Sequence, residues 1–134
     1  MYIIGINAYH ADSSACILKD GKLITAVEEE RLTRIKHFAG FPKLSIKHCL
    51  DECKISLSDV RYVAINQDPK ANNLKRLIFL LTHRPELKYI IEKITKRKKY
   101  QSIKETLNQE FKNDQFKGEV INIEHHLAHL SSCF

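Results

Sequence analysis

The chain has 134 residues, a formal net charge of +6 and a pI near 9.2, with 43% hydrophobic and 28% charged residues. This is the length and composition of one globular domain with its own core, and no apolar run approaches the roughly 20 residues that a bilayer-spanning helix needs. We therefore expect a soluble protein without a membrane partner. The positive charge favours anionic partners without identifying one.

The cysteines indicate a reducing compartment. Cys16, Cys49, Cys53 and Cys133 form no CxxC pair, and no secretory signal precedes them. We therefore expect a cytoplasmic protein with free thiols. The chain ends at residues 131–134 inside a predicted helix without a cap or turn signal, so we also expect a fragment of something longer.

The first part of the chain predicts a three-stranded meander. The apolar run at residues 2–7 is typical of a central strand buried on both faces. A polar turn at residues 10–14 leads to a second strand at 15–19, and Asp20-Gly21 suits a two-residue hairpin before a third strand at 22–27. The polar turn then lies at the first corner of the meander.

A helix and a fourth strand follow. Pro42 suits the first turn of a helix over residues 43–53, where Ile46, Cys49, Leu50 and Cys53 repeat with the spacing i, i+3, i+4, i+7. After a turn at 56–59, residues 60–66 predict a strand that pairs in parallel after the helical crossover.

Residues 70–115 have a helical pattern, which Pro85 interrupts. Ser102 and Glu105 have the spacing of a capping box that opens the last helix of this segment, ending at Lys117-Gly118. The basic run at residues 96–99 lacks the stacking aromatics and broad basic face of a nucleic-acid site, so we interpret it as a solvated link and expect no nucleic-acid partner.

A short buried strand at residues 119–123 runs into a helix that begins with histidines. His125 and His129 are four residues apart, so on a helix they share one face and can bind one metal ion. A helical histidine is more often structural, but the carboxyl end of a strand is where open α/β sheets bind ligands. The metal would be iron(II), manganese or zinc, with magnesium possible beside a nucleotide. Glu124 points elsewhere on the helix, so Asp12 or residues beyond Phe134 would complete the site.

The polar turn and the basic segment after the third strand are candidates for phosphate contacts. Ser13 and Ser14 with neighbouring N–H groups can cradle a phosphate, Asp12 can hold a metal or orient water, and the His10 imidazole can act as a general base. Turns are also rich in Asp and Ser for conformational reasons alone.

Arg34, Lys36 and His37 can neutralise phosphate charge. The alternative pairs them with the glutamates at residues 28–30 as surface ions.

Three segments together resemble the N-terminal domain of O-carbamoyltransferases of the nodulation-factor and antibiotic-tailoring kind. They are IGINAYHADSSA at 4–15, VEEERLTRIKH at 27–37 and HHLAH at 125–129, and FP at 41–42 and ISLSD at 55–59 are similar too. The resemblance implies an α/β domain of the actin-like ATPase (ribonuclease H-like) class, with a mixed sheet and flanking helices. Residues 1–134 would be the N-terminal part of that domain, with the rest of the enzyme absent.

The resemblance also implies the chemistry. Such enzymes use ATP and carbamoyl phosphate to form carbamoyl-adenylate, then carbamoylate a hydroxyl of a sugar or natural product. His125 and His129 would bind the metal that holds the nucleotide, His10 and Asp12 would lie by the carbamoyl group, and Lys36 and His37 near the phosphates. Many relatives have a histidine directly before the aspartate, where this chain has Ala11, so the role of His10 assumes a one-residue shift.

Two other functions are compatible with the sequence. A tRNA threonylcarbamoyl transferase characteristically has a glutamate between its two histidines, which Leu127-Ala128 lacks. A non-catalytic metal- or nucleotide-binding remnant would keep the same clusters for some time after truncation. We expect the 134-residue chain alone to be inactive, because half of a nucleotide cleft cannot enclose ATP.

Overall fold

The computed structural model describes residues 1–67 and 102–131. The helical pattern expected at 70–101, with Pro85 and the basic run at 96–99, lies outside the described residues, as does Cys133. None of the described helices has the length and apolar composition needed to cross a bilayer.

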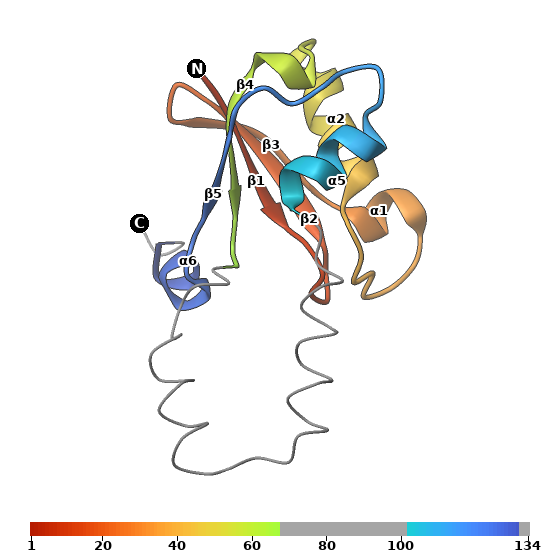
Figure 1. Cartoon of the computed structure of the whole chain (residues 1–134). Helices are drawn as coiled ribbons and strands as arrows, with labels where there is room; N and C mark the ends of the chain where they lie inside the picture. The colour runs from red at the N-terminus through yellow and green to blue at the C-terminus, as the bar shows by residue number, and fades with distance from the viewer. Residues whose placement is uncertain (68–101, 132–134) are drawn as a thin grey trace, which may run out of the picture.

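Five strands form one mixed sheet in the order β3-β2-β1-β4-β5 (Figure 1). β1 pairs antiparallel with β2, and β2 with β3, whereas β4 pairs parallel with β1 and β5 parallel with β4. This order, with β2 alone reversed, is the ribonuclease H-like sheet that we expected, with helices flanking it. The strands are β1 Tyr2–Asn7, β2 Ser14–Lys19, β3 Lys22–Glu28, β4 Val60–Ile65 and β5 Glu119–Asn122.

The meander, its hairpin turn and the parallel fourth strand are confirmed. Asp20 and Gly21 have φ angles of 50° and 80°. Two successive positive φ angles are what a type I′ hairpin requires, and the pair is tolerated because Gly has no Cβ and Asp adapts to the left-handed region.

The helices are α1 Glu29–Thr33, α2 Lys43–Cys53, the 3₁₀ turn η1 Leu57–Asp59, α5 Ile103–Glu110 and α6 His125–Ser131. The predicted bounds of α2 are confirmed, but α1 was not expected. Glu29 in α1 is 2% exposed, and its carboxylate accepts hydrogen bonds from the N–H groups of Leu44 and Ser45 at 3.0 and 2.7 Å. It thereby caps the N-terminus of α2, a role that the preceding Pro42 side chain cannot fill.

The hydrophobic core lies between the sheet and the layer that holds α2 and α5 (Figure 1). Residues on one face of the strands form one cluster with residues of both helices and with Phe116, which follows α5: Ile4, Ile6, Ala15, Ile17 and Val63 with Ile46, Cys49, Leu50 and Leu107. The expectation that β1 is buried on both faces is wrong, because Gly5 and Asn7 on the opposite face are only half-buried. No described helix covers that opposite face as α2 and α5 cover the first.

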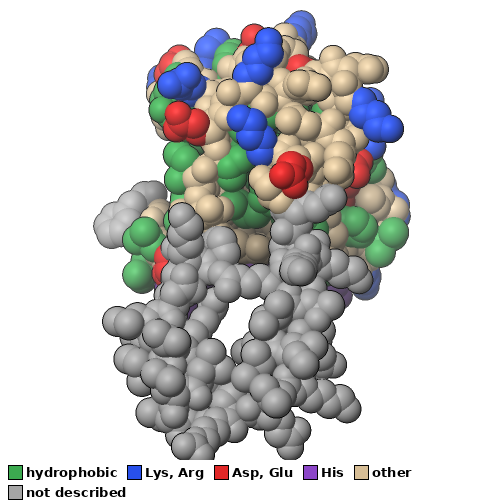
Figure 2. Space-filling view, in the orientation of Figure 1, with side chains coloured by type: hydrophobic (Ala, Val, Ile, Leu, Met, Phe, Trp, Pro, Cys, Tyr) green, Lys and Arg blue, Asp and Glu red, His purple; other side chains and the backbone are tan. Residues whose placement is uncertain are grey.

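Two further expectations near the end of the chain are wrong. β5 is not a buried strand: it lies at the edge of the described sheet, and Ile121 is 43% exposed. Ser102 precedes α5 but makes no side-chain capping bond, and α5 ends at Glu110 rather than near Lys117. The space-filling view, in the orientation of Figure 1, shows the surface of the described residues from one side. Lys and Arg side chains are spread over this surface, with acidic side chains among them (Figure 2).

Candidate functional site

The predicted site residues gather at one edge of the sheet. β1, β4 and β5 are parallel, so their carboxyl ends lie together, which is where open α/β sheets place ligands. The loop after β1 and helix α6 meet there: the rings of His10 and His125 have centroids 5.7 Å apart. Two segments far apart in the sequence thus lie side by side.

His125 and His129 lie on one face of α6. Their Nε2 atoms are 3.0 Å apart and their rings are perpendicular, with centroids at 4.5 Å. Metal–nitrogen bonds of about 2.0–2.1 Å allow two ligand nitrogens roughly 3 Å apart, so the pair fits a shared metal ion. Among residues 1–67 and 102–131, no third histidine, cysteine or carboxylate joins this pair in a cluster of possible ligands.

The Glu124 side chain bonds to residues in the first turn of α6. Its carboxylate accepts hydrogen bonds from the backbone N–H of Leu127 at 2.9 Å and pairs with His126 Nδ1 at 2.6 Å. The bond to His126 and then that to Leu127 lower the pKa of this carboxyl group. The prediction that Glu124 points away from the metal pair agrees with this geometry.

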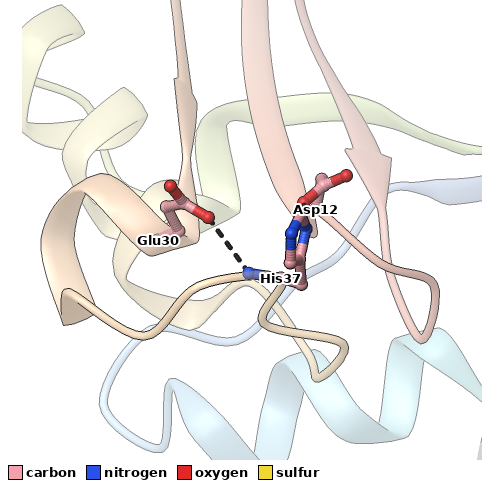
Figure 3. Close-up of side chains that lie close together, drawn as sticks. All are labelled: Asp12, Glu30 and His37. Atoms are coloured by element: carbon pink, nitrogen blue, oxygen red, sulfur yellow. Dashed lines mark hydrogen bonds and ion pairs between the residues drawn. The ribbon is translucent and has the colours of Figure 1, made fainter.

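Asp12 lies with His37 and Glu30 instead of with His125 and His129 (Figure 3). His37 Nδ1 is 2.9 Å from Asp12 Oδ1, and the His37 backbone N–H donates to Glu30 Oε2 at 3.0 Å. Hydrogen bonding to Asp12, and then its negative charge, raise the pKa of His37. The possible ligand atoms of the three residues lie within 4.8 Å of one another, but their mutual hydrogen bonds already hold the cluster together.

Arg34 and Lys36 do not form the surface ion pairs that the alternative interpretation gave them. Neither side chain forms an ion pair with a described residue; in this segment Arg31 pairs with Glu28 at 3.6 Å. Arg34 ends α1 in a left-handed conformation with φ of 62°, and its N–H donates to Glu30. Both cations therefore remain candidates for phosphate contacts.

The two serines of the polar turn have different surroundings. Ser13 is fully buried, and its hydroxyl donates to the carbonyl oxygens of Gly40 at 2.8 Å and His10 at 3.2 Å. Its N–H donates to Phe38, so it ties the turn to the loop before α2. Ser14 lies on the opposite, uncovered side of the sheet. The phosphate contacts of both stay a prediction.

A groove of about 820 Å³ runs along the uncovered face of the sheet to α6. Its lining includes residues that sequence reasoning missed: Asn7, Arg31 and Asn66, in addition to Ser14 and His129. The alternation of Ile4 and Ile6 with Gly5 and Asn7 is a signal that could have indicated a second, polar face. A side chain at Gly5 would put its Cβ 2.8 Å from Cys16 Sγ, so the glycine lets the two strands approach.

Amide side chains hold the loop that carries His10 and Asp12. Asn7 Nδ2 donates to the carbonyl of Asp12 at 3.0 Å, and Asn66 Nδ2 donates to Asn7 Oδ1 at 2.9 Å. Gln67 Nε2 donates to the carbonyl of Ala8 at 2.6 Å. The end of β4 thereby fixes the turn after β1.

Comparison with known proteins gives a family and several relatives. Residues 2–134 match the family described as Carbamoyltransferase N-terminus. The chain is 32% identical over 133 residues to the nodulation protein NolNO of Sinorhizobium fredii, covering 96% of this chain and 18% of that protein. It is 48% identical over 68 residues to the uncharacterized protein sll1178 of Synechocystis, covering 51% of this chain and 11% of that protein.

The chain therefore spans less than a fifth of the length of these two relatives. Among solved structures, YeaZ from Pseudomonas aeruginosa is similar with a TM-score of 0.45 and 12% identity, covering 92% of this chain and 42% of that chain. The fold assignment above rests on strand order and direction, and not on this likeness.

Proposed function

This chain belongs to the carbamoyltransferase N-terminal family, and on that premise we propose that it is the N-terminal part of an ATP- and carbamoyl-phosphate-dependent O-carbamoyltransferase. The enzyme forms carbamoyl-adenylate and passes the carbamoyl group to a hydroxyl of a sugar or natural product. The remainder of the enzyme supplies the rest of the nucleotide cleft. The free thiols of Cys16, Cys49 and Cys53 support a cytoplasmic location.

The observation that carries the proposal is the meeting of His10 with the histidine pair of α6. The His10 and His125 rings are 5.7 Å apart at the carboxyl edge of the sheet, although 115 positions separate them in the sequence. A purely structural histidine on α6 would not need a partner from the β1–β2 loop. The arrangement supports one site that uses both segments.

His125 and His129 are the residues that would hold the divalent metal, through their facing Nε2 atoms. When bound, this ion supplies positive charge that orients the nucleotide phosphates and stabilises the charge on the leaving pyrophosphate. Iron(II), manganese and zinc suit two imidazoles, and magnesium can accompany ATP.

His37 and Asp12 act as a unit in the proposed site. Asp12 favours the protonated imidazole, so His37 carries positive charge at a higher pH than an isolated histidine does. With Arg34 and Lys36 in the same segment, a charged His37 stabilises phosphate oxygens of the substrates. Asp12, which lies by the carbamoyl group in this proposal, then positions His37 beside the phosphates.

His10 is our candidate for the base that accepts the proton of the acceptor hydroxyl. A neutral imidazole has a ring nitrogen that can accept this proton. Its ring lies next to His125, so a hydroxyl that enters beside the metal pair comes within reach of both rings.

The test is ATP–pyrophosphate exchange that depends on carbamoyl phosphate, measured on the complete polypeptide of which this chain is the N-terminal part. His125→Ala should abolish the exchange. His126→Ala is the matched control, because His126 adjoins the pair but bonds to Glu124 and is largely exposed; it should keep the exchange.

Exchange that needs carbamoyl phosphate and disappears only in His125→Ala would establish adenylate chemistry at the histidine pair. A folded, metal-loaded, full-length protein without exchange would refute the proposal and favour a non-catalytic binding remnant. The purified 134-residue chain should show no carbamoyl transfer, since it holds one side of the cleft only.

A further inference from the structure

A network of hydrogen bonds runs from the end of β4 to His37. Asn66 Nδ2 donates to Asn7 Oδ1 at 2.9 Å, and Asn7 Nδ2 donates to the backbone carbonyl of Asp12 at 3.0 Å. The Asp12 carboxylate in turn lies 2.9 Å from His37 Nδ1. The network therefore connects the ends of two parallel strands, β1 and β4, with the two loops that carry Asp12 and His37.

The carbonyl groups around Asn7 fix the orientation of both amides. Asn7 Nδ2 faces the carbonyl oxygens of Asp12 at 3.0 Å and Ala11 at 3.5 Å, and these oxygens can only accept. The Asn7 oxygen must therefore face Asn66, and the Asn66 atom 2.9 Å from it must be the NH₂ group. Exchanging the two atoms of Asn66 would bring two oxygens together, so Asn66 serves as the donor that orients Asn7.

The Asn66 amide contributes little to the stability of the fold. Its carboxamide oxygen is buried and has no hydrogen-bond partner among the described residues. A buried acceptor without a donor destabilises the folded state, and such groups are rare in native proteins. An apolar side chain at this position would avoid that penalty and lose only the bond to Asn7. What the amide adds is the orientation of Asn7, and such departures from the rules of stability are expected at functional sites.

The orientation of Asn7 decides where Asp12 lies. With its oxygen bonded to Asn66, Asn7 directs its NH₂ group at the Asp12 carbonyl. Asp12 has a φ of 63°, a conformation that a residue with a side chain keeps only when the surrounding bonds hold it. Resting on the proposed function, we infer that Asn7 and Asn66 are positioning residues. They set the Asp12 carboxylate against His37, the group that we place beside the substrate phosphates.

The first test measures the pKa of His37 by NMR titration of the ring in the 134-residue chain, together with Tm. Asn66→Leu and Asn7→Leu should each move this pKa part of the way toward its value in Asp12→Asn, because they loosen the carboxylate that lies 2.9 Å from the ring. Tm should change little in Asn66→Leu, since the lost bond and the removed unsatisfied oxygen offset each other. A purely structural role would give the opposite result, a lower Tm at an unchanged pKa.

The second test measures ATP–pyrophosphate exchange dependent on carbamoyl phosphate on the complete polypeptide. Each single substitution should lower kcat about tenfold, as a small misplacement of a group at the substrate can do. Because Asn66 acts through Asn7, the variant with both substitutions should have the kcat and the His37 pKa of Asn7→Leu alone.

Gln67→Ala is the matched control. This neighbouring amide bonds to the carbonyl of Ala8 at 2.6 Å and not to Asn7, so its removal should leave the His37 pKa and kcat at their original values.

An unchanged His37 pKa in folded Asn66→Leu and Asn7→Leu would overturn the inference. So would additive effects of the two substitutions, or a moved pKa with an unchanged kcat. The pKa is measured without turnover, so it tests the positioning role even in an inactive protein. Absence of carbamoyl-phosphate-dependent exchange in the unsubstituted complete polypeptide would refute the proposed function itself, a result distinct from all of these.

Discussion

The two sides of the proposed site are held in place very differently. The β1–β2 loop is tied down by tertiary hydrogen bonds: Ser13 bonds to Gly40 and Phe38, and Asn7 bonds to Asp12. α6 has no buried residue, and its Leu127 and Leu130 are 55% and 65% exposed. The loop side is therefore preorganised by the described fold, whereas α6 on the histidine side buries none of its residues against it.

The largest expected effect is on global stability. It compares two carboxylates that cap helices, Glu29 at α2 and Glu124 at α6. Glu29→Ala should destabilise the 134-residue chain by about 3 kcal/mol, because it leaves buried N–H groups of α2 and the Ser45 hydroxyl without their acceptor. Glu124→Ala removes an exposed cap and should change global stability much less. Urea denaturation measures both, and equal losses would contradict the comparison.

A bound metal ion should stabilise helix α6 and leave the β1–β2 loop side of the proposed site unchanged. Adding Zn²⁺ to the 134-residue chain should raise Tm by roughly 1–3 °C and slow amide exchange in α6 but not in α2. Imidazoles bind metal only when neutral, so protons compete with the ion and the effect should weaken as the pH falls.

His125→Ala should abolish the zinc effect on α6, and His126→Ala should preserve it, since His126 pairs with Glu124 instead. Protection that spreads equally to α2, or that survives in His125→Ala, would show that the metal binds elsewhere.

The smallest effect concerns the ion pair between Asp12 and His37. Asp12→Asn should lower the pKa of His37 toward its ordinary value, as measured by NMR titration of the ring. Because folding raises this pKa, the stabilisation from the pair is complete below the unfolded-state pKa and is lost as pH rises through the folded-state pKa.

The stability difference between the unsubstituted chain and Asp12→Asn should therefore be larger near pH 5.5 than at pH 8, and small at both because the pair is exposed. An unchanged His37 pKa in the variant would show that the hydrogen bond between His37 and Asp12 does not persist in solution.

Elements with a strong local pattern could be predicted from the sequence. The spacing of Ile46, Cys49, Leu50 and Cys53 gave the bounds of α2, and Asp20-Gly21 gave the hairpin turn. α1 was missed, because nothing in three successive glutamates indicates which of them will be buried under another helix. β5 was expected to be buried because its residues are apolar, yet apolar residues can also lie at the edge of a sheet.

The same distinction, between local sequence patterns and tertiary contacts, applies to the candidate site. The spacing of His125 and His129 within one helix was enough to predict their facing nitrogens, since helical geometry is local. The partners of Asp12, Glu29 and Asn66 lie 25, 16 and 59 positions away, and no local sequence pattern indicates them. Periodicity and turn chemistry depend on neighbouring residues and can be read along the chain. Hydrogen bonds between distant segments depend on strand order and on how closely the backbones approach, and these exist only once the sheet has formed.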